Sequence, residues 1–452
     1  MKRIRFSLST TQVILLSFVA AIFIGSALLM LPISSAKGVT VSYVDALFTA
    51  TTATCVTGLV TLPTATAWSP FGQAVILILI QIGGLGIITT MSGLMLLLNK
   101  KMGIGDRLLV QDAFNLSTMS GLARFIKKVL LGTFIIEGIG ALLYMTVFVP
   151  RFGARGIWIS IFNSVSAFCN AGIDVLSENS LCDYATHPLV NGVTSALIIL
   201  GGLGYIVWWD VIRAFKSRTT RNKRIFKRLS LHSKIALTST AVLLLSGALL
   251  FLIFEYNNPQ TIGELSLFDK LQVAAFQSVT TRTAGFASVP QEHLTNPSAA
   301  LSVILMVIGG SPVGTAGGMK TVTVAVLLCS ALATVRNKSS ATMFGRSIAE
   351  GSIRRATAVA VTFMTICSIS TVLLMATNSV SAIDAVYETV SATATVGLSR
   401  SLTPSLNLVG KLIIIATMYL GRVGPISLAM ALSGSNENKN VISEPDENIS
   451  IG

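Results

Sequence analysis

The sequence predicts an all-α integral membrane protein built from four covalently linked, pseudo-fourfold units, each consisting of a helix, a re-entrant pore loop and a second helix. Three observations support this prediction. The 452-residue chain is 52% hydrophobic and 12% charged, with a mean hydropathy of +0.74, a composition typical of membrane proteins. A short motif that ends in glycine recurs four times at a nearly constant spacing. The basic residues are distributed very unequally among the segments that connect the apolar runs.

The recurring motif is an aromatic residue followed by a run of small residues that a glycine closes. The glycines are separated by 114, 113 and 112 residues, and their positions are Gly58, Gly172, Gly285 and Gly397. The aromatic residue precedes its glycine by ten residues at Phe48, Phe162 and Tyr387, and by nine at Phe276. A fixed period of this length indicates one structural unit copied four times, because unrelated helix-capping glycines would not share an aromatic partner and a spacing.

The net charge of +14 reflects topology. On the proposed arrangement, 25 of the 33 Lys and Arg residues lie on one side of the membrane, in the N-terminus, the connections and the tail. The positive-inside rule therefore places both termini and the basic connections in the cytoplasm, and it makes nucleic-acid binding the wrong interpretation of the charge. Ten acidic residues fall in the outer segments. They would either concentrate cations at an acidic mouth or be ordinary solvated loop charges.

The first half of the chain divides as follows. Residues 1–10 form a cytoplasmic N-terminus, and unit one spans 11–102, with helices at 11–31 and 71–98 around a pore segment at 43–62. A polar, helical cytoplasmic connection is expected before residue 128. Unit two spans 129–218, with helices at 129–149 and 190–212 around a pore segment at 157–176.

The second half repeats this plan. Unit three covers 235–335, with a helix at 235–254, a pore segment at 268–288 and a second apolar stretch at 299–333. Unit four covers 356–433, with helices at 356–377 and 408–432 around a pore segment at 382–400, and 434–452 is a polar cytoplasmic tail. The sum is eight spanning helices and four re-entrant loops, and an even number of spans keeps both termini on one side.

Four such units around one axis would bring four short extended strands together. Their backbone carbonyl oxygens could then replace the water shell of an ion. Glycine suits this position because it has no side chain and adopts positive φ readily, and the C-terminal ends of the pore helices would add partial negative charge.

Unit three contains a stretch that a continuous helix would not tolerate. Residues 309–318 include five glycines and a proline, which disfavour a helix. Non-helical backbone within a bilayer is tolerated where it is buried in the protein or lines a water-filled path. We expect a mobile loop that obstructs the cytoplasmic half of the pore. Arg422 lies 25 residues after Gly397, as Gly310 lies 25 residues after Gly285. The guanidinium of an arginine at membrane depth must be hydrogen-bonded to a partner or hydrated. We therefore expect Arg422 to bind loop carbonyls and Ser311, unless it extends to the cytoplasmic interface.

The glycine patterns at 83–86, 201–204 and 421–424 have a simpler interpretation. Glycine permits close packing between spanning helices, and this is the reading we favour for units one and two. Arg282, beside the third filter glycine, would repel cations if it faced the axis. We expect it to turn away, towards Asp269 or Glu388.

The four-unit plan and its motifs closely resemble the Ktr/Trk/HKT superfamily of potassium transporters, and within it the membrane subunits of bacterial Ktr systems. The motifs are Thr-Cys-Val-Thr-Gly58, Phe-Cys-Asn-Ala-Gly172, Thr-Arg-Thr-Ala-Gly285 and Ala-Thr-Val-Gly397, and the resemblance extends from about residue 11 to residue 433. It implies gated potassium uptake through a single central pore. Glycine at all four positions is the potassium-permissive pattern of the family.

The resemblance also implies site residues. The K⁺ filter would consist of Val56, Thr57, Gly58, Asn170, Ala171, Gly172, Thr283, Ala284, Gly285, Thr395, Val396 and Gly397. The gate would consist of Gly309, Gly310, Ser311, Pro312, Gly314, Gly317, Gly318 and Arg422.

By the same resemblance we expect a homodimer in the bacterial cytoplasmic membrane, in contact with lipid and controlled by a cytosolic nucleotide-binding ring of the RCK type. The basic connections 213–234 and 336–355 would dock that ring or set topology and contact lipid headgroups. No organic cofactor is expected on this chain, and K⁺ is the transported ion.

Two other classes were considered. A membrane enzyme would need clustered intramembrane carboxylates or histidines, whereas Glu137 is the only acid well inside a predicted helix, and the five cysteines and three histidines show no metal-ligand spacing. A sodium-coupled secondary transporter usually has inverted repeats, whereas these repeats run in parallel. The alternative of sodium-coupled symport remains open, because the residues do not reveal sodium dependence.

Overall fold

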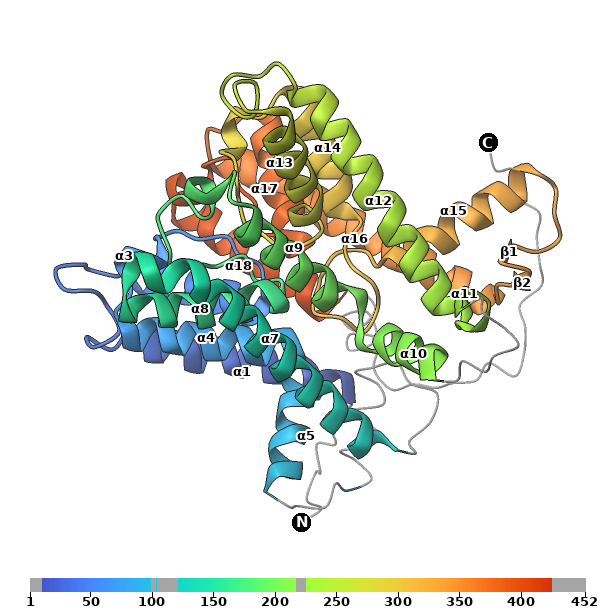
Figure 1. Cartoon of the computed structure of the whole chain (residues 1–452), viewed down its shortest axis with the longest axis horizontal. Coiled ribbons are helices and arrows are strands. Elements are labelled where there is room, and N and C mark those ends of the chain that lie inside the picture. The colour runs from blue at the N-terminus through green and yellow to red at the C-terminus, as the bar shows by residue number, and fades with distance from the viewer. Residues whose placement is uncertain (1–9, 99–102, 104–120, 217–224, 425–452) are drawn as a thin grey trace, which may run out of the picture.

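A computed structural model describes residues 10–98, 103, 121–216 and 225–424. The described chain is almost entirely helical and falls into four consecutive groups of helices (Figure 1). The predicted N-terminus, much of the first cytoplasmic connection, the end of the helix at 408–432 and the tail lie outside the described residues.

Unit one begins with a 20-residue helix whose side chains are almost all apolar. Pro32 follows its end, and the re-entrant helix then starts at a Ser42 cap whose side chain accepts a hydrogen bond from the Asp45 N–H. Its elements are α1 (Thr10–Leu29), α2 (Tyr43–Cys55), α3 (Thr64–Ala67), α4 (Pro70–Leu85) and α5 (Ile87–Leu97).

Unit two begins with a helix of 31 residues. At 1.5 Å per residue this helix is about 47 Å long, so it extends well beyond a hydrocarbon core of about 30 Å. The elements are α7 (Leu122–Phe152), α8 (Ala154–Cys169), the 3₁₀ turn η1 (Cys182–Tyr184), α9 (Pro188–Leu203) and α10 (Tyr205–Lys216).

Unit three differs from the others in its last third, where a non-helical stretch separates two short helices. The elements are α11 (Ile225–Arg228), α12 (Leu231–Glu255), α13 (Leu267–Thr280), η2 (Gln291–His293), α14 (Asn296–Val307) and α15 (Thr321–Val335). The non-helical stretch, residues 308–320, is called the intramembrane loop below. It lies where the glycine- and proline-rich sequence predicts a break.

Unit four follows a small antiparallel hairpin of β1 (Thr342–Met343) and β2 (Arg346–Ser347), which turns at two residues with positive φ, Phe344 and Gly345. Helix α16 (Glu350–Thr377) starts six residues before its predicted start at 356. It is followed by α17 (Ala382–Thr393), η3 (Thr403–Ser405) and α18 (Leu408–Val423).

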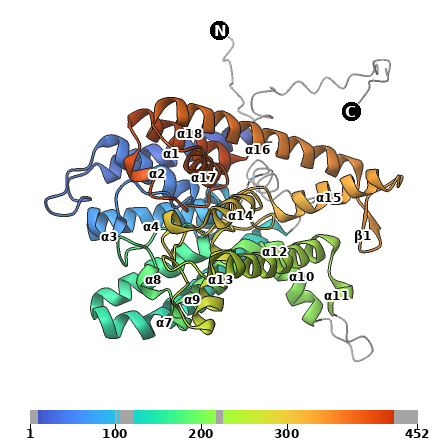
Figure 2. The same cartoon turned by 90° about the horizontal axis from the view of Figure 1, so that it is seen from above.

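The four units surround a common centre, so that the first and the last are neighbours (Figure 2). Helix α4 packs on α8, α9 on α13, α14 on α17, and α18 on α2. An ion pair between Lys411 and Asp45, with 2.7 Å between Nζ and Oδ1, joins units four and one across 366 residues of sequence. The short helices α2, α8, α13 and α17 form the inner layer and are mostly buried.

In the described part of the chain, four unbroken helices are long and apolar enough to cross a membrane, and they are the first helices of the four units: α1, α7, α12 and α16. The second helices are interrupted. Helices α4 and α5 meet at 99°, and α9 and α10 meet at 94°. The predictions of continuous helices at 71–98 and 190–212 were therefore wrong.

Both bends occur at the last glycine of a repeated glycine pattern. Gly86 and Gly204 have φ of 84° and 86° and ψ of 134° and 141°, a conformation that no right-handed helix contains and that glycine adopts without strain. Gly424, the last described residue, has the same backbone conformation, with φ of 89° and ψ of 141°. The close-packing interpretation holds for earlier glycines of the same patterns. A Cβ on Gly83 or Gly201 would overlap the carbonyl oxygen of Thr54 or Phe168.

Candidate functional site

The ends of the four inner helices share an unusual backbone turn. The residue two positions before each motif glycine has positive φ, although none of these residues is glycine: 55° at Val56, 60° at Asn170, 62° at Thr283 and 51° at Thr395. Positive φ is rare for β-branched residues and costs about 1–3 kcal/mol per residue. The same strained conformation at four equivalent positions indicates a functional constraint.

The residue that precedes each glycine returns its N–H to the inner helix of its own unit. The donor–acceptor distances are 2.9 Å for Thr57 to Thr52, 2.8 Å for Ala171 to Ser166, 3.0 Å for Ala284 to Thr280 and 2.8 Å for Val396 to Ser391. These four bonds attach the end of each strand to the inner helix of its own unit.

The four glycines form a closed ring. A Cβ built on Gly58, Gly172 or Gly285 would lie 2.6 Å from the carbonyl oxygen that precedes the glycine of the next unit, at Ala171, Ala284 and Val396 respectively. A Cβ on Gly397 would overlap the oxygen of Thr57, which returns the ring to unit one. The contacts thus run from unit one to two, three, four and back to one, which places four carbonyl oxygens from four distant segments around one small space.

An outer cavity of ≈ 410 Å³ opens on one side of this ring. All four glycines line it, and so do three carboxylates: Asp174, Glu178 and Glu292. No Lys or Arg lines it among the described residues. Burial raises the pKa of the Asp174 carboxyl to about 6, although the N–H groups of Leu176 and Ser177 donate to it. The cavity therefore has a negative lining, which attracts cations.

The intramembrane loop lies against the other side of the ring. The Gly317 N–H donates to Oγ1 of Thr283 at 3.2 Å, and Oγ1 of Thr315 donates to the side-chain oxygen of Asn170 at 2.9 Å. The loop also extends over unit two, where the Ser311 N–H donates to the Gly202 oxygen at 2.8 Å and the Tyr205 N–H donates to the Val313 oxygen at 2.9 Å. The loop is therefore directly bonded to two of the four strands and covers the inner side of the ring.

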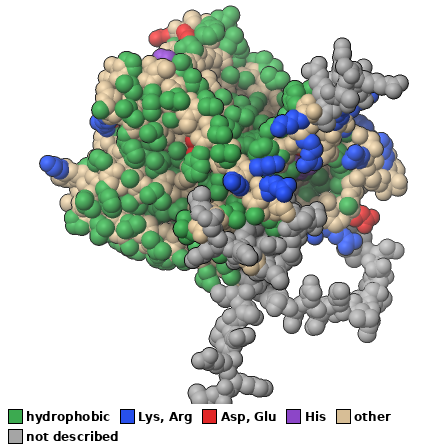
Figure 3. Space-filling view, turned by 60° about the horizontal axis from the view of Figure 1, so that its bottom comes forward, with side chains coloured by type: hydrophobic (Ala, Val, Ile, Leu, Met, Phe, Trp, Pro, Cys, Tyr) green, Lys and Arg blue, Asp and Glu red, His purple; other side chains and the backbone are tan. Residues whose placement is uncertain are grey.

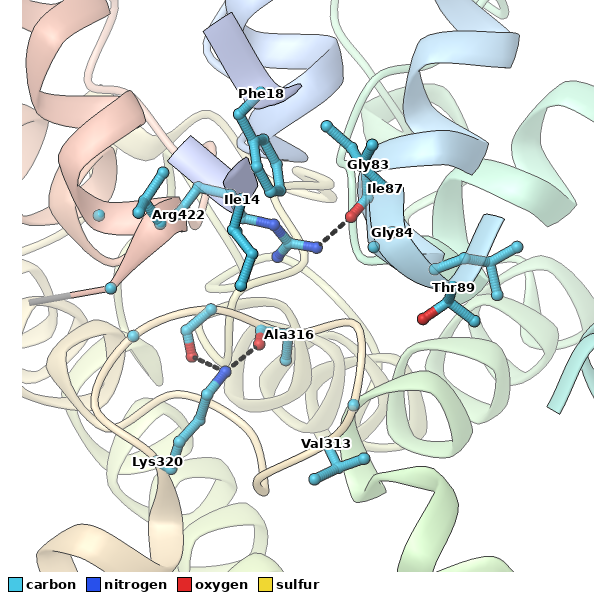
Figure 4. A pocket seen from close by; sticks show the side chains of 18 of the residues that line it. Ile14, Phe18, Gly83, Gly84, Ile87, Thr89, Val313, Ala316, Lys320 and Arg422 are labelled. Carbon is cyan, nitrogen blue, oxygen red and sulfur yellow. Dashed lines mark hydrogen bonds between the residues drawn. The ribbon is translucent and has the colours of Figure 1, made fainter. Parts of the chain in front are cut away.

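Arg422 holds this loop from unit four. Its Nη1 donates to the Thr315 oxygen at 2.8 Å. Its Nη2 donates to the Gly83 oxygen of unit one at 2.6 Å (Figure 4). A loop carbonyl is thus an acceptor, as expected. Ser311 is not an acceptor, because its hydroxyl pairs with Thr321 at 3.1 Å. Both donor nitrogens of Arg422 are bonded to main-chain oxygens of other units.

An inner cavity of ≈ 400 Å³ lies beside the loop and Arg422. Both Arg422 and Lys320 line it, and no acidic residue does so among the described residues. The Lys320 ammonium donates to the carbonyl oxygens of Ala316 and Gly317 at 2.5 and 3.5 Å (Figure 4). The two cavities therefore carry opposite charge on either side of the ring.

Arg282 turns away from the ring, but not towards the expected partners. Its Nη2 donates to the Gly309 oxygen at 3.3 Å and to Oγ1 of Thr240 at 3.4 Å. Asp269 caps its own helix through Ser266, and Glu388 accepts hydrogen bonds from Ser399 and Thr403. The predicted pairing with either acid was wrong, because both acids lie nearer to the outer surface and Arg282 points to the inner side.

The structure brings together every predicted filter strand and places the predicted loop beneath them. Sequence reasoning missed Thr315, Lys320 and the two glycines at the helix bends, Gly86 and Gly204. Thr315 lies inside the glycine-rich stretch 309–318 and Lys320 lies two residues after it, so their positions in the sequence could have identified them as part of the gate. The bends had a weaker signal, the repeat of a final glycine in three of the four units.

The fold and the site define an integral membrane protein of four linked helical units around one ring of glycines. Residues 3–441 match the family model of TrkH, described as a cation transport protein, and the chain belongs to this family.

Two relatives match along their whole length. The potassium/sodium uptake protein NtpJ of Enterococcus hirae is 40% identical over 457 residues, which cover 100% of this chain and 99% of the relative. The Ktr system potassium uptake protein B of Bacillus subtilis is 40% identical over 442 residues, which cover 98% of this chain and 96% of that protein.

The crystal structure of the potassium transporter TrkH from Vibrio parahaemolyticus has the same fold, with a TM-score of 0.74. It covers 95% of this chain and 86% of its own at 16% sequence identity.

Proposed function

We propose that this protein takes up potassium ions across the bacterial cytoplasmic membrane through the central ring. The observation that carries the proposal is the closed contact ring of the four glycines with the carbonyl oxygens of Thr57, Ala171, Ala284 and Val396. Backbone carbonyls that converge from four sides replace the hydration shell of an alkali cation. The names of the two full-length relatives, which are both potassium uptake proteins, support the choice of ion.

In this proposal the twelve filter residues act through their main chain. The strained turns at the positions before the glycines fix the strands, so that the carbonyl groups need no reorganisation when an ion arrives. Each strand has one glycine instead of the two of a Thr-Val-Gly-Tyr-Gly filter, which implies fewer ion sites and looser discrimination. The negative outer cavity concentrates cations before they enter.

The intramembrane loop would be the gate. Residues Gly309, Gly310, Ser311, Pro312, Gly314, Gly317 and Gly318 form a segment that covers the inner side of the ring, and Arg422 binds it from unit four. While Arg422 and Lys320 hold the loop, their basic side chains face the inner cavity and oppose cation passage. Release of the loop would open the path.

The direct test is ion flux through the purified protein in liposomes, measured with K⁺ and with Na⁺ under the same gradient. We expect K⁺ flux to exceed Na⁺ flux, and Gly58→Ser to reduce this ratio, because φ of 102° and a carbonyl contact at 2.6 Å exclude a side chain there. A suitable control is Gly138→Ser, since a Cβ on Gly138 meets nothing within 4 Å. Equal ion ratios in the parent and in Gly58→Ser would contradict the filter assignment.

A sodium-coupled symporter is the second candidate, and the name of the Enterococcus hirae relative, a potassium/sodium uptake protein, favours keeping it. A symporter would move K⁺ against its own gradient when only a Na⁺ gradient is imposed. In a gated pore, K⁺ flux would follow the potassium gradient and the membrane potential, whether or not Na⁺ is present. Flux under an imposed potential, with and without Na⁺, separates the two.

The proposal includes partners. We expect a homodimer surrounded by membrane lipid, with both termini in the cytoplasm and a cytosolic nucleotide-binding ring of the RCK type on the basic face. Lys and Arg side chains gather on one end of the molecule (Figure 3). The predicted docking connections contain Arg213, Lys227, Arg228 and Arg346. Charge reversal at these positions should weaken co-purification of the ring subunit without reducing membrane insertion.

A further inference from the structure

The position three residues before the filter glycine distinguishes unit three from the other units. It is occupied by small side chains in units one, two and four, namely Cys55, Cys169 and Ala394, all of them fully buried. In unit three it is Arg282, which is also buried. A side chain several atoms longer therefore has to find space behind the third strand.

Helix α14 leaves this space free. Helices α4, α9 and α18 have 16 residues each, whereas α14 has 12. The missing four residues correspond to about one turn, or about 6 Å of helix. In the other units this last turn presents a glycine to the inner helix, as Gly421 does to the Thr393 oxygen. In unit three the chain leaves the helix early, and the guanidinium of Arg282 donates to the main-chain oxygen of the second loop residue, Gly309.

Neighbouring residues of the third strand hold the two ends of the loop. Arg282 binds the Gly309 oxygen, and Thr283 accepts from the Gly317 N–H. The ends are also joined to each other, since the Gly309 N–H donates to the Met319 oxygen at 2.9 Å and the Met319 N–H donates to the Val307 oxygen at 3.1 Å. The loop is therefore attached to the ring at its base, independently of Arg422.

Packing alone does not explain an arginine at this site. Among the described residues, no carboxylate forms an ion pair with Arg282, and its Nε has no hydrogen-bond partner. A buried charge without a counter-charge is unfavourable compared with an apolar side chain of similar volume. The function that an apolar side chain could not perform is donation to the Gly309 oxygen.

We propose that Arg282 is a positioning residue that occupies the place of the missing helical turn and anchors the start of the intramembrane loop to the third filter strand. The proposal rests on the function proposed above and adds a second anchor to the gate, located behind the filter. Loss of this anchor should loosen the base of the loop and leave the strand itself in place.

The experiment compares the parent protein with Arg282→Met, Arg282→Lys and Thr240→Val in liposomes, with the exposed Arg155→Met as a control. Potassium influx is measured over a range of concentrations, and backbone hydrogen exchange of residues 308–320 is measured by mass spectrometry. For Arg282→Met we expect about tenfold faster exchange in the loop, the size of effect that loss of one bond from a charged donor produces. We expect a higher maximal influx with an unchanged KM for potassium, partial rescue by Arg282→Lys, and parent behaviour in Arg155→Met.

The outcomes distinguish this inference from the proposed function. If the loop exchanges at the parent rate in Arg282→Met while potassium influx continues, the anchor is refuted and the pore stands. If KM or the K⁺/Na⁺ ratio changes and loop exchange does not, Arg282 supports the filter and the inference is also refuted. If Arg282→Met does not fold, Arg282→Lys decides, because a single ammonium on a shorter side chain cannot reproduce the guanidinium contact with the Gly309 oxygen; parent exchange in the loop would then overturn the proposal. Absence of potassium flux in the parent would refute the proposed function itself.

Discussion

Replacement of Arg422 by methionine would remove two hydrogen bonds between units and one positive charge from the inner cavity. The bonds join Nη1 to the Thr315 oxygen at 2.8 Å and Nη2 to the Gly83 oxygen at 2.6 Å. A hydrogen bond from a charged donor contributes about 1.5–3 kcal/mol. Only the bond to Thr315 holds the loop, so its loss should favour the released loop by at least about 1.5 kcal/mol, or about tenfold in the opening equilibrium.

The assay is potassium influx into liposomes that contain equal amounts of folded protein. Arg422→Met should raise influx about tenfold if the loop is rarely open in the parent protein, and Arg422→Lys should fall between the two, because one ammonium cannot reproduce the two-armed contact. A rise in influx with an unchanged K⁺/Na⁺ ratio would place the effect at the gate. Parent-like influx in a correctly folded Arg422→Met protein would refute the reasoning.

Other perturbations test separate parts of the site. Gly397→Ser should lower potassium selectivity at least as strongly as Gly58→Ser, because its Cβ would overlap the Thr57 oxygen; the readout is the K⁺/Na⁺ flux ratio, and equal ratios would contradict the ring. Deletion of residues 311–317 should raise flux, and unchanged flux in a folded deletion would show that the loop is not the gate. The affinity for external potassium should increase from about pH 5 to about pH 7, since the pKa of Asp174 is raised to about 6 and its carboxylate forms as pH rises through that value. Asp174→Asn should remove this pH dependence. If the pH dependence persists in Asp174→Asn, another group causes it.

Much of this architecture could be predicted from the sequence, because it is repeated. The period of the four glycines and their aromatic partners identified the units and the inner helices. A different observation located the intramembrane loop: five glycines and a proline within ten residues are incompatible with a helix. The residues of the ring could be predicted without knowing which distant segments contact each other, because the same motif occurs in each strand.

The failures concern features that depend on tertiary contacts. A glycine in an apolar helix can serve either close packing or a break, and only the surrounding contacts of Gly86 and Gly204 decide which. The partner of Arg282 could not be deduced either. Its acceptor is the main-chain carbonyl of Gly309. Every residue has such a carbonyl, so the sequence does not indicate which one accepts the bond. The two acids that seemed to be natural partners lie on the other side of the ring.

A single polypeptide for all four quarters has a consequence for how the passage can be closed. In a channel assembled from identical subunits, any insertion beneath the ring would occur four times, and four copies would compete for the same narrow space. Among the described residues, one quarter has a shorter second helix, the loop of residues 308–320 and an arginine where the other three have small residues. A single chain can therefore carry a loop on one side of the passage that an assembly of four identical subunits could not accommodate.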